Sequence, residues 1–162
     1  MTRLTLMRHA KSSWDRPDLR DIERPLNARG NRDATLMGLV CAERLPSPDL
    51  VLVSPAVRTR ETIDLFFEAW ISADPDVLVE EDLYLADRGD WLLVLSENAA
   101  RTNHILACSH QPGVGDIARW LCRDFDADVP TATIISIVLE TDELDQSSGK
   151  LDFIGSPKDF LD

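Results

Sequence analysis

The chain has 162 residues, of which 44% are hydrophobic, so a single domain with a buried core is expected over residues 1–162. Its formal net charge is −12, although residues 1–32 carry eight Lys and Arg against four Asp and Glu. Nucleic-acid binding needs basic surface over many phosphates, so this balance argues against it, whereas a small basic pocket suits one phosphate group.

The cysteines and the N-terminus indicate the compartment. Cys41, Cys108 and Cys122 are odd in number and lie in apolar stretches, which favours reduced, packed thiols over a disulfide framework. The apolar run near the start is far shorter than a signal-peptide core, and no stretch approaches the roughly 18 apolar residues of a membrane span. We therefore expect a soluble, cytoplasmic monomer that does not contact a membrane.

Short apolar runs alternate with helical patterns along the chain. Strands are predicted where a run is short and rich in β-branched residues or leucine. These runs are 3–8, 50–54, 103–109, 132–139 and 150–154. Helices are predicted where apolar residues recur at helical spacing. These segments are 36–41, 63–70, 88–97 and 114–121.

This alternation predicts an α/β fold. A three-layer α/β/α sandwich with a mainly parallel central sheet accommodates strands and helices that follow one another in turn. The polar segment 140–149 separates the last two predicted strands and favours an antiparallel hairpin. We therefore expect an antiparallel edge on the otherwise parallel sheet.

Polar residues directly follow three of the predicted strands. Ligands of open α/β sheets bind beyond the carboxyl ends of the strands. Arg8 and His9 end the first strand, and His110 follows the strand at 103–109. Arg58 falls in the first turn of a helix, where free backbone N–H groups and the helix dipole favour an anion. Each residue alone could be a solvated arginine or an incidental histidine, but their coincidence at three strand ends favours a site.

An arginine-histidine pair, a second arginine and a second histidine are what phosphoryl transfer requires. A neutral imidazole nitrogen can attack phosphorus in line, and guanidinium groups can neutralise charge on the equatorial oxygens. This chemistry needs neither a metal nor a cofactor. A metal site is also disfavoured because His104 and His110 lack carboxylate or thiolate ligands at a recognisable spacing.

Three segments, LMRHA, SPAVRTRET and SHQPGVG, resemble the signature segments of the histidine phosphatase superfamily, also called the phosphoglycerate mutase-like family. The short length and the segments RHAKSSW, DIERPLNARG and DLYLAD resemble its SixA-type phosphohistidine phosphatase branch. The resemblance implies a covalent phosphohistidine intermediate on His9, phosphate clamps at Arg8 and Arg58, and a fourth phosphate contact at His110. Ala10 stands where the superfamily usually has glycine, a variation that this branch tolerates.

One departure from the superfamily concerns the general acid. Many members carry a glutamate that protonates an alcohol leaving group, and Leu85 occupies the comparable position here. Asp82 and Asp87 are the nearest candidate acids. Asp87 is better interpreted as the N-cap of the helix predicted at 88–97.

The irregular segment that follows the first strand supplies further candidates. Lys11, Ser12 and Arg24 are candidates to line the pocket mouth and contact the substrate, and a surface or structural role is the alternative for each. Asp15 and Asp21 could approach the leaving group, although a solvated loop carboxylate is the more common outcome.

The missing glutamate bears on the substrate. An alkoxide needs a proton in order to leave, whereas an imidazole, whose conjugate acid has a pKa of about 6.5, leaves with less help. A phosphorylated histidine of a partner protein, or a small phosphoramidate, is therefore the expected substrate. The alternatives are a phosphomonoesterase for a small phosphorylated metabolite and a weakly catalytic phosphate-binding domain.

Overall fold

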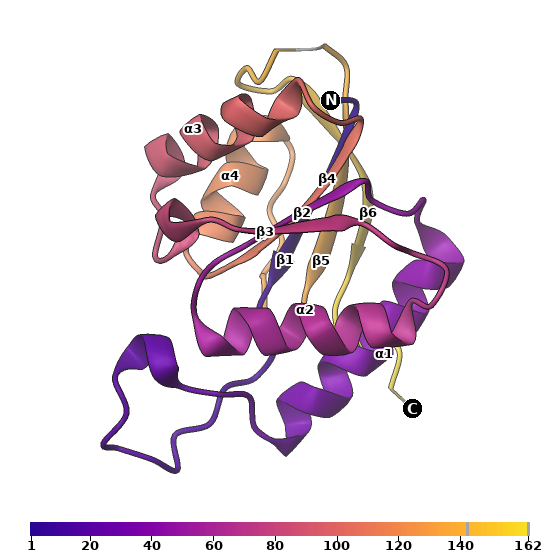
Figure 1. Cartoon of the computed structure of the whole chain (residues 1–162). Coiled ribbons are helices and arrows are strands. Elements are labelled where there is room, and N and C mark those ends of the chain that lie inside the picture. The colour runs from indigo at the N-terminus through magenta and orange to yellow at the C-terminus, as the bar shows by residue number, and fades with distance from the viewer. Residues whose placement is uncertain (142, 162) are drawn as a thin grey trace.

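In the computed structural model, which describes residues 1–141 and 143–161, six strands form one sheet in the order β3-β2-β4-β1-β5-β6 (Figure 1). The strands from β3 to β1 are parallel, and β5 is antiparallel to both of its neighbours. The strands are β1 (Arg3–Arg8), β2 (Leu50–Val53), β3 (Asp76–Val79), β4 (His104–Ser109), β5 (Ile134–Leu139) and β6 (Gly149–Gly155).

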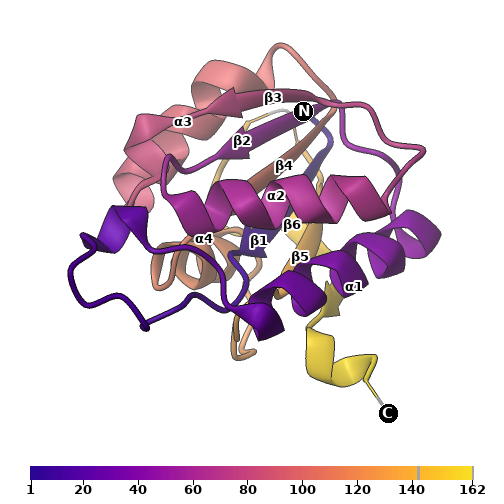
Figure 2. The same ribbon diagram turned by 60° about the horizontal axis from the view of Figure 1, so that its bottom comes forward.

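Helices cover both faces of the sheet, which gives three layers (Figures 1 and 2). One face carries α1 (Ala28–Arg44) and α2 (Val57–Ala69), and the other carries α3 (Arg88–Ala99) and α4 (Gly113–Leu121). The three-layer α/β/α prediction, with its mainly parallel sheet and antiparallel edge, is therefore confirmed. Short 3-10 helices lie at η1 (Asp21–Glu23), η2 (Glu81–Leu83) and η3 (Pro157–Asp159).

Side chains that point alternately to the two faces of the sheet form two hydrophobic cores, one on each side of it. Leu50 and Leu52 of β2 belong to the core beneath α3 and α4, while Val51 and Val53 belong to the core beneath α1 and α2. Successive strand residues point to opposite faces, so a strand that is apolar throughout suits a sheet covered on both sides. This is why the parallel strands appear in the sequence as continuous apolar runs.

The strand β3 was not predicted from the sequence. It has only four residues, all of them exposed, and lies at one edge of the sheet. The antiparallel pairing of β5 with β6 is confirmed, although residue 142 of the polar connection lies outside the described residues. The other predicted strands agree with the structure to within two residues at each end.

The cysteines are buried free thiols, as predicted, and burial raises the pKa of Cys41 to about 12. Within residues 1–141 and 143–161, no helix combines the length and the apolar character needed to span a membrane. The same part of the chain holds no cluster of three His, Cys, Asp or Glu side chains arranged to bind a metal ion.

Candidate active site

Three parallel strands end at the same edge of the sheet and bring the predicted residues together. β1 and β4 end in register, with Arg8 opposite Ser109, and β2 lies on the other side of β4. The residues that follow, His9 and His110, therefore leave neighbouring strands side by side. Their ring centroids lie 5.2 Å apart at an interplanar angle of 59°.

The two nitrogens of His9 have distinct partners. Nδ1 lies 2.7 Å from the carbonyl oxygen of Ala10, which can only accept, so Nδ1 carries the ring proton. Nε2 accepts a hydrogen bond from Arg58 Nε at 3.3 Å. Burial, together with the positive charges of Arg58 and Arg8, lowers the pKa of His9 to about 4. At neutral pH the imidazole is therefore uncharged, with its lone pair on Nε2.

His110 is held in the opposite tautomer. Its Nδ1 accepts from Arg58 Nη2 at 3.3 Å, because a guanidinium can only donate. Its Nε2 therefore carries the proton and donates to Ser54 Oγ at 2.7 Å. Burial, with smaller contributions from His9 and Arg58, lowers the pKa of His110 to about 3. Both histidines are thus neutral in the unliganded pocket.

Arg58 joins the histidine pair to the loop between β1 and α1. It lies in the first turn of α2, as predicted, and is 4% exposed. Its Nη1 and Nη2 donate to the backbone oxygen and to Oδ2 of Asp21, at 2.6 and 2.9 Å. In Figure 2 this loop, with η1 in it, lies beside the start of α2. One guanidinium therefore contacts both histidines and the loop carboxylate.

Asp21 is the centre of a second hydrogen-bond network. The Tyr84 hydroxyl donates to Asp21 Oδ2 at 2.6 Å, and Arg24 Nη1 donates to Oδ1 at 3.1 Å. Partial burial opposes ionisation of Asp21, but the hydrogen bonds from Tyr84 and Arg58 outweigh it and lower the pKa to about 2. Asp21 is therefore a carboxylate, and not a proton donor, at neutral pH.

Arg8 offers a free donor beside the histidines. Its Nη1 donates to the carbonyl oxygen of Val129 at 2.8 Å. Its Nε is buried and has no hydrogen-bond partner among the residues that the structure describes. A buried N–H without a partner is costly, so this position favours an acceptor such as a phosphate oxygen.

The three residues predicted at the pocket mouth lie at different depths. Arg24 is buried, donates to Ser12 Oγ, and stacks its guanidinium 3.3 Å from the ring centroid of Trp14. Its positive charge makes a small contribution to the lowered pKa of His9. The side chain of Lys11 is half-buried.

The candidate acids after β3 have other surroundings. Asp87 accepts from the backbone N–H of Asp90 at 3.1 Å, which confirms the N-cap interpretation. Asp82 is exposed on η2. Leu85, at the position of the superfamily's glutamate, is 61% exposed and has a φ of 52°, which is unusual for a leucine. The carboxylate that contacts the arginine comes from the loop after β1 instead.

Tyr84 is a site residue that the sequence analysis missed. Its ring packs edge-on against His110, with centroids 5.4 Å apart at 88°. It also donates to Asp21, so it joins the loop carboxylate to the histidine pair. The signal available was its place in the DLYLAD segment, which carried the resemblance to the SixA-type branch.

A neutral histidine held against a guanidinium group at the strand ends of an α/β sheet is suited to phosphoryl transfer. Residues 4–113 match the family described as the histidine phosphatase superfamily (branch 1). The chain belongs to this superfamily and is a phosphatase. The matched region contains both arginines and both histidines of the pocket.

Curated relatives match the chain over different lengths. An uncharacterized protein of Mycobacterium tuberculosis is 34% identical over 131 residues, which cover 80% of this chain and 78% of that protein. An uncharacterized chloroplastic protein of Arabidopsis thaliana is 48% identical over 61 residues, which cover 38% of this chain and only 28% of the plant protein. The match to the mycobacterial protein thus covers most of both chains, whereas the match to the plant protein covers a short part of each.

Solved structures share the fold. The protein histidine phosphatase SixA complexed with tungstate aligns with a TM-score of 0.83 and 24% identity, covering 98% of this chain and 99% of that one. A protein assigned as SixA of Agrobacterium tumefaciens aligns with a TM-score of 0.83 and 23% identity, covering 96% and 98%. The fold of this phosphatase is therefore SixA-like.

Proposed function

We propose that the phosphatase transfers the phosphoryl group of a partner protein's phosphohistidine to His9 Nε2 and then hydrolyses the covalent intermediate. The observation that carries the proposal is the state of His9, which is neutral, fixed through Nδ1, and has its lone pair on Nε2, where it accepts a 3.3 Å hydrogen bond from Arg58. An activated nucleophile of this kind splits one difficult displacement into two easier ones. His9 forms a new P–N bond while the bond to the substrate imidazole breaks.

Arg8 and Arg58 act as the phosphate clamp in this proposal. We assign the equatorial phosphate oxygens to Arg8 Nε, which has no hydrogen-bond partner among residues 1–141 and 143–161, and to the Arg58 nitrogens that contact the two histidines. His110 supplies a further N–H. The negative charge of a bound phosphate favours its protonated form, which raises its pKa from the value in the unliganded pocket.

The carboxylate of Asp21, which contacts Arg58, indicates which kind of leaving group the site favours. Asp21 is ionised, so it cannot supply the proton that an alkoxide needs. A substrate imidazole leaves as the neutral ring when its other nitrogen already carries a proton taken from solvent, so it needs no acid from the enzyme. Water then attacks the phosphorus of phosphorylated His9, the P–N bond breaks, and inorganic phosphate is released. These steps favour a phosphoramidate over a phosphate ester.

The test is paired turnover, without added metal, of a phosphohistidine peptide and a panel of phosphate monoesters. We expect a strong preference for the P–N bond. Rapid quenching should also trap a phosphoryl group on His9 that is labile in acid and stable in base. Preference for one ester would contradict the proposed substrate, and turnover of neither class would contradict catalysis and favour a phosphate-binding role.

A further inference from the structure

β3 is an edge strand of the sheet (Figure 1), and no strand within residues 1–141 and 143–161 pairs with its outer side. The backbone N–H of Asp76 donates to the carbonyl oxygen of Asp49, which precedes β2, at 3.1 Å, and that of Glu80 donates to Val53 of β2 at 2.9 Å. Since backbone direction alternates along a strand, the N–H and C=O groups of Val77 and Val79 point away from β2. Both valine side chains are about half exposed, at 50% and 49%. The edge is therefore apolar and able to pair with another strand.

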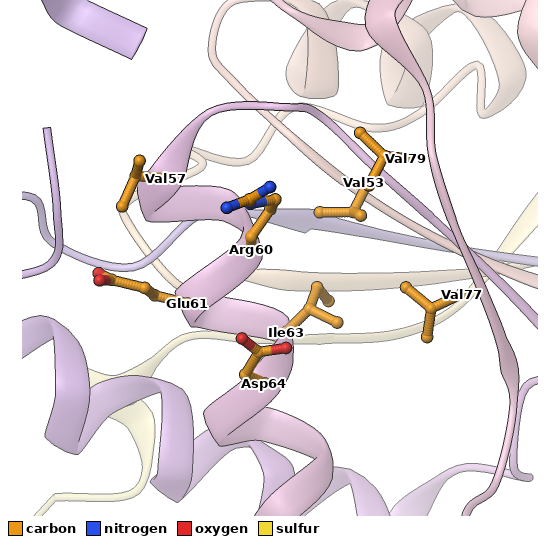
Figure 3. Close-up of a pocket in the computed structure, with 8 residues that line it drawn as sticks. All are labelled: Val53, Val57, Arg60, Glu61, Ile63, Asp64, Val77 and Val79. Carbon is orange, nitrogen blue, oxygen red and sulfur yellow. The ribbon is translucent and has the colours of Figure 1, made fainter. Parts of the chain in front are cut away.

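A hollow of about 330 Å³ lies beside this edge, between α2 and β3 (Figure 3). Val53, Ile63, Val77 and Val79 line it with apolar surface. Its polar rim comes from α2, with Arg60, Glu61 and Asp64. An added strand would place alternate side chains over this hollow, so the site offers both backbone pairing and an apolar contact.

The charges around the edge select the kind of strand that fits. Residues 74–82 contain five acidic residues and no basic one. The ion pairs among the described residues include none of these five carboxylates. A second copy pairing here would place acidic groups opposite acidic groups, which disfavours self-association. A segment that alternates apolar and basic residues is complementary to this surface.

The edge also leads directly to the catalytic residues. β3 continues through η2 to Tyr84, whose ring packs against His110 and whose hydroxyl donates to Asp21. The η2 segment is tied to the end of β4, because Ser109 Oγ donates to the carbonyl oxygen of Leu83 at 2.6 Å. A chain bound along β3 would therefore reach the histidine pair within a few residues.

We propose that the β3 edge docks an extended basic and apolar segment of the phosphorylated partner protein as an additional strand. The docked segment presents the partner's phosphohistidine to His9. This inference rests on the proposed function, because it identifies how the same site receives its protein substrate. It goes beyond that function in assigning specificity to a surface outside the phosphate pocket.

Synthetic phosphohistidine peptides provide the first test. One carries a Lys-Val-Lys-Val-Lys tail a few residues from the phosphohistidine, in two versions with the tail before or after it. Matched peptides replace Lys with Glu, or replace Val with Gly at unchanged charge. We expect kcat/KM to be about tenfold higher for a Lys-Val tail than for either replacement. Equal values would contradict docking by strand addition.

The second test changes the edge itself. Val77→Pro removes an outward N–H that β2 does not use, so the sheet should tolerate it. We expect about tenfold lower kcat/KM for the Lys-Val peptide and unchanged turnover of a small phosphoramidate. Val77→Thr keeps the N–H and the β-branched shape, and should behave as wild type. Unchanged turnover of the Lys-Val peptide by a folded Val77→Pro variant, or an equal loss with Val77→Thr, would overturn the inference.

A charge-swapped variant covers the case in which Val77→Pro misfolds. Asp76→Lys combined with Glu81→Lys should shift the preference toward the Glu-Val tail.

Fluorescence anisotropy of the unphosphorylated Lys-Val peptide measures docking without turnover, so it separates this inference from the proposed function. Failure of all phosphoramidate turnover with intact peptide binding would contradict only the function. Absence of peptide binding, or a wild-type dimer that Val77→Pro dissociates, would contradict the docking assignment.

Discussion

His104 and His110 lie at opposite ends of β4, and their surroundings differ. Both are buried, and burial is the main cause that lowers their pKa values, to about 4 and about 3. His104 contacts Thr5 Oγ1 at 2.9 Å and the carbonyl oxygen of Ser47 at 3.3 Å. His110 instead contacts the guanidinium of Arg58 and the ring of His9.

This difference shows that burial and a low pKa do not identify a catalytic histidine. His104, at the amino end of the parallel strands, is a packed residue whose neighbours satisfy both ring nitrogens. His110 follows the carboxyl end, where strand ends, the first turn of α2 and a loop converge. Convergence of charged groups from separate elements is what makes one end of β4 a site.

Replacing His9, the proposed nucleophile at the carboxyl end of the strands, should have the largest effect. His9→Ala should lower kcat by about 10⁴-fold or more, because the covalent route then has no acceptor for the phosphoryl group. Steady-state turnover of a phosphohistidine peptide measures the effect, and circular dichroism checks the fold. If this variant retained most of its activity, the mechanism proposed for the carboxyl end of the strands would be wrong.

Removing the guanidinium should have the next largest effect. Arg58→Ala should weaken transition-state stabilisation by roughly 3 to 4 kcal/mol, or about 10²- to 10³-fold in kcat, because Arg58 faces charge that develops during transfer. The measurement is kcat and KM determined separately. A change confined to KM would indicate that Arg58 binds substrate and transition state equally.

Matched substitutions of the two β4 histidines sharpen the comparison directly. His110→Gln should lower kcat by about 10²-fold, since a phosphate contact is lost. His104→Gln should leave kcat near wild type and cost about 1 kcal/mol in the free energy of unfolding, because buried hydrogen bonds are disturbed. Urea unfolding and turnover of both variants give the result. Equal losses of activity would remove the distinction between the two ends.

The last expected effect is a pH dependence of the free energy of unfolding, to which both of these histidines contribute. In the folded chain, burial holds the pKa of His104 at about 4 and that of His110 at about 3, below the value near 6.5 in an unfolded chain. Between these values the unfolded chain binds more protons, so the free energy of unfolding should decrease as pH falls from 6.5 toward 4. NMR titration of the ring nitrogens checks the folded values. Midpoints near 6.5 would contradict the burial argument.

Much of the fold could be predicted because its signals are local. Continuous apolar runs identified strands covered on both faces, and helical spacing identified the helices between them. The four central site residues followed from the rule that ligands bind at strand ends. The strand β3 escaped prediction because its four exposed residues lack the buried pattern that identified the others.

The residues around the arginine clamp required the tertiary structure. The sequence left Asp21 as either a solvated loop carboxylate or a group that approaches the leaving group. Its ionised state depends on hydrogen bonds from Tyr84 and Arg58, which lie far along the chain. Tyr84 itself lies in no catalytic pattern that spacing reveals. The sum of such non-local contacts sets a pKa, so it cannot be obtained from any single segment.

The sequence by itself determined the order of the helices and of every strand except β3, and with it the strand ends that carry Arg8, His9 and His110. The strands and helices follow from hydrophobic periodicity, and the site follows from polar residues adjacent to the apolar runs. Only the tertiary structure decided that Arg58 holds the loop carboxylate, and that an acidic edge strand leads into the same site. Those features arise from contacts between distant segments, whose geometry is established only when the sheet and its helices pack together.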